Sequence, residues 1–240
     1  MLMPLILDVF APPFGPGDPR RGRAVGALEQ AWAVHLVCDL DEDGRPIRHD
    51  ADREAYLASN TRGGLPFLTT PDDEESATIG GLLEPDVFAP GGVEELHVLA
   101  SVPSRSAPTL SRGLELVADA LAASWAMLTP EPAHGAIVQQ VIAVNSDDKP
   151  PAGLPRLDLA EFLAVDTPRR LGWISYWSDR VAARLGFTGN AESFASVQRV
   201  ATGWIVQLTV EPLDLERADH MAALGNAYER FPLIGRAALK

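Results

Sequence analysis

The chain has 240 residues, enough for one large domain or two small ones, and 46% of them are hydrophobic, as in an ordinary globular protein. Its formal net charge of −13 argues against nucleic acid or an anionic membrane as a partner, because both attract positively charged protein surfaces. Cys38 is the only cysteine, which excludes an intrachain disulfide and fits a reducing compartment.

The apolar amino-terminal stretch predicts a buried strand over residues 2–10. It lacks a basic segment and Asp8 interrupts it, so it does not have the pattern of a signal peptide. No other apolar run in the sequence is long enough to cross a bilayer. We therefore expect a cytoplasmic protein without membrane partners.

The rest of the first half predicts further strands with short helices between them. Asp18 is placed to cap a helix from Pro19 to Trp32, with proline where a missing N–H costs nothing. A second, short helix is expected over residues 52–58. The expected strands cover residues 33–40, 65–70, 77–83 and 94–102, and a return strand follows the Asp-Glu-Asp-Gly turn at 41–44.

The second half begins with the longest helical signal, over Thr109–Leu128. Its apolar stripe consists of Leu110, Leu114, Val117, Leu121 and Trp125, spaced three or four residues apart. The polar, proline-rich residues 145–155 form the best internal boundary. After it we expect a strand at 172–176 that runs into a helix ending near Leu185, a hairpin around Thr202-Gly203, and a last helix over 217–228.

These elements predict an α+β fold, with a mixed or antiparallel sheet packed against helices. Residues 1–240 are expected to form a single domain, or two closely packed halves that meet within 145–155. Aromatic residues concentrate between Arg170 and Gly235, where large rings indicate a core. The predicted core residues there are Trp173, Trp177, Trp204, Tyr228 and Phe231. A small-molecule or peptide pocket lined by the tryptophans is the alternative.

Catalytic and cofactor motifs are missing from the sequence. Its five histidines lack the helical spacing of a zinc site, and no serine lies in a Gly-x-Ser-x-Gly elbow. Cys38 falls in an apolar strand, where cysteine is usually inert. We therefore expect neither an enzyme nor a metal or organic cofactor, although dispersed carboxylates leave a hydrolase with an unusual site open.

Residues 39–50 have the carboxylate spacing of a calcium loop. The matching positions 1, 3, 5, 6 and 12 are Asp39, Asp41, Asp43, Gly44 and Asp50. The aspartate at the last position reaches less far than the usual glutamate, Pro46 lacks an N–H, and the flanks predict strands. A solvated Asp-Gly hairpin turn is therefore the favoured interpretation, with a calcium-dependent interaction module as the alternative.

Several carboxy-terminal motifs resemble bacterial immunity proteins of polymorphic toxin systems, above all the immunity protein 52 family. The matching segments are Leu171–Tyr176, Thr202–Thr209, Asp214-Leu215 with His220, and Ala227–Pro232. The amino-terminal strand followed by Ala-Pro-Pro and the Leu65-Pro66-Phe67 segment are similar to a related uncharacterised family found largely in myxobacteria. That second resemblance spans most of the chain.

The resemblance implies a protein that binds and neutralises a cognate toxin, often a nuclease of the restriction-endonuclease type. A nuclease groove is basic because it holds phosphates, so an acidic inhibitor could cover it after fast, electrostatically steered association. The acidic residues that we expect to contact the toxin are Asp41, Glu42, Asp43, Asp72, Asp73, Glu74 and Glu75.

Overall fold

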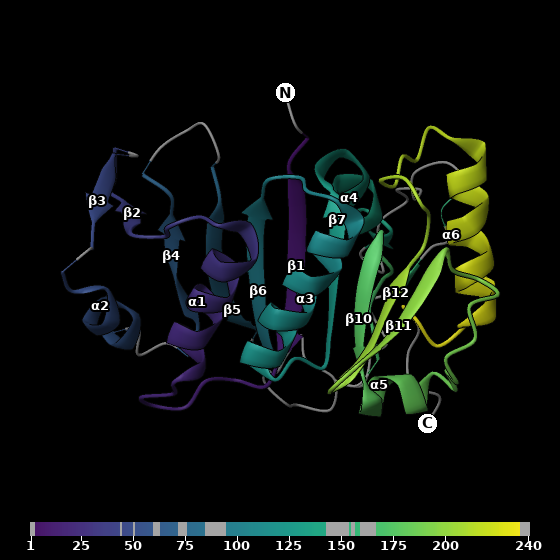
Figure 1. Cartoon of the computed structure of the whole chain (residues 1–240), viewed down its shortest axis with the longest axis horizontal. Coiled ribbons are helices and arrows are strands. Elements are labelled where there is room, and N and C mark those ends of the chain that lie inside the picture. Colours follow the sequence, from purple (N-terminus) through teal and green to yellow (C-terminus); the bar gives the residue numbers. More distant parts are fainter. Residues whose placement is uncertain are drawn as a thin grey trace.

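The computed structural model describes residues 3–43, 45–49, 51–59, 63–71, 76–84, 95–142, 154, 157–158 and 167–235. Most of its strands form one sheet of ten strands in which every hydrogen-bonded pair is antiparallel (Figure 1). In spatial order these strands are β11 (Ser196–Val200), β12 (Gly203–Gln207), β10 (Ile174–Ser178), β7 (Trp125–Pro130), β1 (Leu5–Ala11), β6 (Glu95–Val102), β5 (Thr78–Glu84), β4 (Leu65–Thr69), β2 (Cys38–Leu40) and β3 (Pro46–Arg48).

The α+β fold class predicted from the sequence is confirmed. The helices are α1 (Arg20–Trp32), α2 (Arg53–Ser59), α3 (Ala107–Leu121), α4 (Glu131–Val138), α5 (Asp179–Arg184) and α6 (Ala218–Arg230). Two short strands, β8 (Val141–Ile142) and β9 (Leu157–Asp158), pair in parallel as a separate small sheet. In the described part of the chain, no helix combines the length and apolar character that crossing a bilayer requires.

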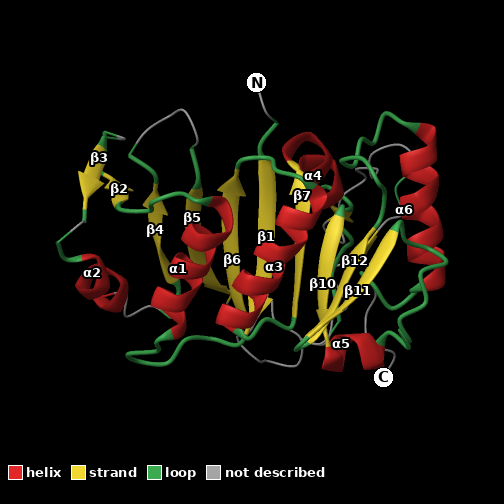
Figure 2. Cartoon of the chain, in the orientation of Figure 1, coloured by secondary structure: helices red, strands yellow, loops and turns green. Residues whose placement is uncertain are grey.

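The long helices α1 and α3 lie side by side over one face of the sheet, here called the first face (Figure 2). Gly113 allows this approach, since a Cβ atom there would lie 2.9 Å from the Trp32 ring. Arg20 strengthens it, because its guanidinium donates to the backbone oxygen of Leu121, at the end of α3. The same side chain binds Asp18 and lowers the pKa of that carboxyl to about 2.

The central strand β1 shows how the two faces of the sheet differ. Side chains alternate along a strand, so Leu5, Leu7 and Val9 share one face and Ile6, Asp8 and Phe10 share the other. Asp8 and Phe10 are fully buried, like their apolar neighbours. A charged residue therefore lies inside the molecule on the second face, at the middle of the sheet.

The helix predicted over 109–128 is wrong beyond Leu121. Ala122 adopts a left-handed conformation with φ of 53°, and its N–H bonds to Ala118 and Asp119 close the helix. The N–H of Ser124 then donates to the oxygen of Phe10, which brings the chain into the sheet as β7. Trp125, assigned to the helical stripe, is instead the first residue of a strand whose six residues are all buried.

The other boundaries agree with the sequence pattern only in part, because Ala33 closes α1 in a left-handed conformation, with φ of 55°, before the next strand begins. The strand expected over 33–40 is limited to Cys38–Leu40. Of the boundary predicted at 145–155, the structure describes only Leu154, and strands from both sides of it, β1–β7 and β10–β12, belong to the same sheet. The hairpin at Thr202-Gly203 and the last helix form where the sequence places them.

Candidate functional site

The turn between β2 and β3 carries the first group of acidic residues expected to contact a partner. Asp41 is half-buried, and its carboxylate accepts the backbone N–H groups of Asp43 at 2.9 Å and Arg45 at 2.7 Å. Glu42 and Asp43 are exposed, and Asp43 forms an open ion pair of 3.3 Å with Arg45. Asp41 thus holds the turn, while Glu42 and Asp43 face solvent. The second group, Asp72–Glu75, lies outside the described residues.

Two of the aspartates that would bind calcium in this turn already accept other hydrogen bonds. An oxygen of Asp39 accepts the Tyr56 hydroxyl proton at 2.6 Å, and Asp41 is engaged by the turn itself. Gly44 and Asp50 lie outside the described residues. Within the described ranges, no three His, Cys, Asp or Glu side chains are grouped so that they could hold a metal ion.

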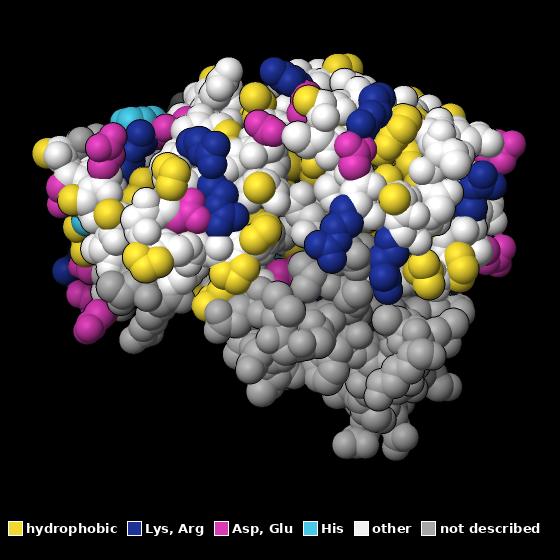
Figure 3. Space-filling model, turned by 90° about the horizontal axis from the view of Figure 1, so that it is seen from below, with side chains coloured by type: hydrophobic (Ala, Val, Ile, Leu, Met, Phe, Trp, Pro, Cys, Tyr) yellow, Lys and Arg dark blue, Asp and Glu magenta, His cyan; other side chains and the backbone are white. Residues whose placement is uncertain are grey.

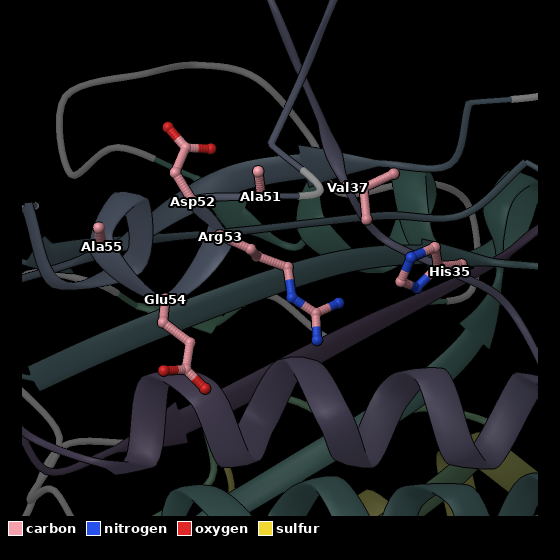
Figure 4. A pocket seen from close by; sticks show the side chains of 7 residues that line it. All are labelled: His35, Val37, Ala51, Asp52, Arg53, Glu54 and Ala55. Carbon is pink, nitrogen blue, oxygen red and sulfur yellow. The ribbon is translucent and has the colours of Figure 1, made fainter.

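A shallow hollow of about 610 Å³ opens at the other end of the β2–β3 hairpin, between the segment that leads into β2 and the start of α2 (Figure 4). Its residues are His35, Val37, Ala51, Asp52, Arg53, Glu54 and Ala55. Arg53 extends from α2 toward α1, where it binds Glu29, while Asp52 and Glu54 point to opposite sides (Figure 4). Glu29 also accepts the backbone N–H of Leu36 at 2.9 Å. Arg53 therefore joins α2 to α1 through its ion pair with Glu29.

Acidic side chains gather at this end of the molecule, which is on the left in Figure 3. The sequence over residues 38–59 contains seven acidic residues and three arginines, a difference of −4. The end of the sheet made by β2, β3 and α2 is thus one local source of the chain's negative charge. Such a surface attracts a basic partner over roughly a Debye length, about 8 Å at physiological salt.

A buried polar cluster lies on the second face of the sheet. The Nε2 atoms of His97 on β6 and His134 on α4 each lie 2.7 Å from a different oxygen of Asp8. Arg170 adds a charge 3.6 Å from the same carboxylate. An ionised carboxylate only accepts, so both imidazoles donate through Nε2. Asp8 thereby joins β1, β6, α4 and the segment that precedes β10.

The charge state of Asp8 follows from these contacts. Burial by itself raises the pKa of a carboxyl group, but the hydrogen bonds from His134 and His97 and the charge of Arg170 outweigh it. Together they hold the pKa of Asp8 well below its ordinary value. Asp8 is therefore ionised at neutral pH.

A second ion pair extends the cluster along β6. Glu95 is buried and accepts a hydrogen bond of 2.9 Å from Arg169. The Arg169 guanidinium lies 4.8 Å from the centre of the Phe10 ring, which is itself stacked between His97 and Trp125. No sequence motif relates His97 or Glu95 to Arg169 and Arg170, since Glu95 and Arg169, for example, are 74 positions apart. The only trace of this cluster in the sequence is Asp8 itself, a charged residue within an otherwise apolar strand.

The predicted aromatic core residues pack together beyond this cluster. Trp173 and Trp177 are buried, and the Trp177 ring contacts Phe187, Phe194 and Phe231 at centroid distances of 5.2–5.7 Å. Tyr228 is also buried, and burial raises the pKa of its hydroxyl to about 12. Trp204 is half-buried under the Arg199 guanidinium. The space around Trp177 is thus occupied by other aromatic rings.

His220, which belongs to one of the segments that resemble the immunity family, lies in the first turn of α6. Its side chain is buried, and its Nδ1 accepts the backbone N–H of Asp214 at 3.0 Å. The ring therefore fixes the loop that leads into α6.

These features define an α+β protein with one large antiparallel sheet, a buried ionic cluster at its centre and an acidic end. Residues 17–238 match the family described as "Domain of unknown function (DUF5953)", so the chain belongs to that family. No curated protein matches the chain.

A solved structure shares the fold. The Pseudomonas aeruginosa T6SS protein PA0821 superposes with a TM-score of 0.57 and 12% sequence identity, over 97% of this chain and 77% of that protein. At this identity the likeness shows a common architecture. It extends over nearly the whole chain, from the acidic end to the aromatic core.

Proposed function

We propose that this protein is an immunity protein, which binds a cognate bacterial toxin and neutralises it by protein–protein contact in the cytoplasm. The observation that carries the proposal is the shared fold, over 97% of the chain, with a protein described as a T6SS protein. The immunity-protein motifs in the carboxy-terminal third support it independently. No catalytic role is assigned to the chain, and no cofactor is required.

The charge of the protein supports a basic toxin, such as a nuclease. A net charge of −13 opposes binding to nucleic acid but favours binding to a surface that itself holds nucleic acid. Glu42 and Asp43 are exposed on a turn whose shape Asp41 maintains, so they are available to such a surface. Contacts of this kind mainly accelerate association and set its salt dependence.

The proposal is tested with the product of the neighbouring gene as the candidate toxin. Cells that express this product should stop growing, and co-expression of the chain should restore growth. Purified chain should capture an inactive form of the product, more strongly at low salt than at high salt. Growth arrest that the chain does not relieve, together with no capture at either salt concentration, would refute the immunity function.

Charge reversal at the acidic turn should slow toxin binding. The double variant Glu42→Lys, Asp43→Lys leaves Asp41 in place, so the turn persists, and the association rate should fall about tenfold at low salt. The difference should shrink at high salt because the charges are screened. A four-residue reversal at Asp72–Glu75 tests the second acidic group in the same way. Surface plasmon resonance at two salt concentrations measures the association rate of each variant.

The control reverses two exposed acidic residues elsewhere, Glu216 and Glu229, and changes the net charge equally. An equal loss of rate in this control would show that only the total charge matters. An unchanged rate in both charge-reversal variants, at Glu42 and Asp43 and at Asp72–Glu75, would eliminate acidic contact at these positions.

A further inference from the structure

Exposed apolar side chains are concentrated at one end of the sheet. The described residues include eight exposed large hydrophobic side chains, and five of them lie on strands β2 to β6 or on the β2–β3 hairpin. These five are Leu40, Ile47, Phe67, Leu82 and Leu99. The other half of the sheet, in contrast, carries the buried aromatic core on its second face. Scattered exposed apolar residues are ordinary, whereas a contiguous group marks a contact surface.

Three of the five form a continuous strip on the second face, and we call Phe67, Leu82 and Leu99 the apolar strip. Leu82 pairs with His97 and Gly80 pairs with Leu99, so Leu82 and Leu99 are diagonal neighbours on one face. A Cβ atom at Gly80 would lie 3.5 Å from the Phe67 ring, which places this ring against β5 beside Leu99. Leu82 is 75% exposed, Leu99 45% and Phe67 38%.

These residues contradict the usual pattern of a solvated sheet face. An antiparallel sheet with one open face normally carries polar residues there. Thr78 and Ser101, which pair on the same face, follow that rule, whereas Leu82 and Leu99 do not. Folding gains little from a leucine that stays three-quarters exposed, so the strip has no evident packing role among the described residues.

The strip lies between a buried ionic contact on one side and the exposed acidic turn on the other. His97 is directly opposite Leu82, and Asp8 is directly opposite Leu99 in the register of β1 and β6. The buried bond between Asp8 and His97 therefore fixes the two strands at the edge of the strip. On the other side, β4 leads to β2 and the exposed Glu42 and Asp43. An apolar centre with a charged rim is the usual anatomy of a protein interface.

We propose that the apolar strip is the centre of the surface that binds the toxin, and that the acidic β2–β3 turn forms its rim. This inference rests on the proposed immunity function and specifies its contact surface. The occupant is a basic protein domain with an apolar patch beside its cationic groove. The strip supplies the buried contact that slows dissociation, and the acidic turn supplies steering.

The charge of the chain decides between a toxin and a second copy of the chain. Two copies would each bring a net charge of −13 and an acidic turn to the same interface, and like charges placed together oppose association. A basic domain has the opposite sign and gains from the same arrangement. Charge complementarity therefore favours the toxin as the occupant.

The test compares the double variant Leu82→Ser, Leu99→Ser with the single variant Val210→Ser. Val210 is 73% exposed, nearly the same as Leu82, but lies after β12 at the other end of the sheet. Binding of the inactive neighbouring-gene product is measured by surface plasmon resonance, which gives the affinity and the dissociation rate, and thermal melting verifies that each variant is folded. The strip variant should bind roughly 10–100-fold more weakly, mainly through faster dissociation, while Val210→Ser binds like the wild type.

The outcomes separate the two proposals. If the wild type binds the product and the strip variant binds it equally well, the strip is not the contact surface and the immunity function stands. If the wild type neither binds the product nor restores growth, the immunity function fails and the strip assignment fails with it. Wild type that dimerises by light scattering, and becomes monomeric in the strip variant, would identify a second copy as the occupant and overturn the proposal.

Discussion

Replacement of Asp8 by alanine is expected to lower the free energy of unfolding by about 3–5 kcal/mol, the range for removing one partner of a buried ionic group. The variant leaves the two imidazole N–H groups without their acceptor and leaves Arg170 without its counter-charge. The Asp8 side chain is only 1% exposed, and those of His97, His134 and Arg170 are 23%, 16% and 9% exposed, so water replaces the lost carboxylate poorly. Urea unfolding followed by circular dichroism measures the loss.

An exposed ion pair provides the comparison. Asp43 pairs with Arg45 in open solvent, so Asp43→Ala should change the free energy of unfolding by less than about 1 kcal/mol. An Asp8→Ala variant that is as stable as Asp43→Ala would show that the cluster contributes no net stability. Asp8→Asn, which keeps the shape but removes the charge, should lie between the wild type and Asp8→Ala.

Asp8 also makes stability depend on pH in a defined direction. Its pKa in the folded state is held below the ordinary aspartate value of 3.8, so below this pH the unfolded chain binds a proton that the folded chain does not. The stabilisation is therefore complete above about pH 4 and is lost as the pH falls toward the pKa of the folded state. Wild type should lose more stability than Asp8→Ala between about pH 4 and pH 2, and parallel curves would contradict the ionic role of Asp8.

The sequence predicts the strands and helices where local pattern and turn chemistry agree. Strands β1, β5 and β6 follow their apolar alternation, and α1 begins next to Asp18 and proline. The same local rule fails at Trp125, which is four residues after Leu121 and so continues the helical spacing by coincidence. A tertiary contact accompanies the end of the helix there. The N–H of Ser124 donates to the backbone oxygen of Phe10, which lies in a strand more than a hundred residues earlier.

The functional features are harder to predict because they depend on distant residues. Asp8 meets His97 and His134, which are 89 and 126 positions away along the chain, and no local spacing relates them. The apolar strip has the same origin, since Phe67, Leu82 and Leu99 become neighbours only through the pairing of three strands. The acidic turn, in contrast, is contiguous in sequence and is therefore visible there, and its role in binding stays a prediction.

Replacement of Trp177 by alanine is expected to cost about 3–5 kcal/mol, the range for large-to-small changes of a buried aromatic residue. Trp177 is fully buried on β10, and its ring is surrounded by Phe187, Phe194 and Phe231. No small rearrangement fills the cavity, since these rings come from two separate segments of the chain, the connection between α5 and β11 and the residue that follows α6. Chemical unfolding measures the stability, and the near-ultraviolet circular dichroism of the folded variant reports how the remaining rings repack.

Trp204→Ala provides a matched comparison that also separates the core from a ligand pocket. Trp204 is half-buried and lies under the exposed Arg199 side chain, so its removal should cost clearly less than that of Trp177. If the tryptophans lined a pocket for a small molecule or peptide, Trp177→Ala would abolish ligand binding but leave stability nearly intact. A large loss of stability, without any fluorescence response of the wild type to added ligands, is the result that a packed core requires, and it leaves the surface of the protein as the place of its function.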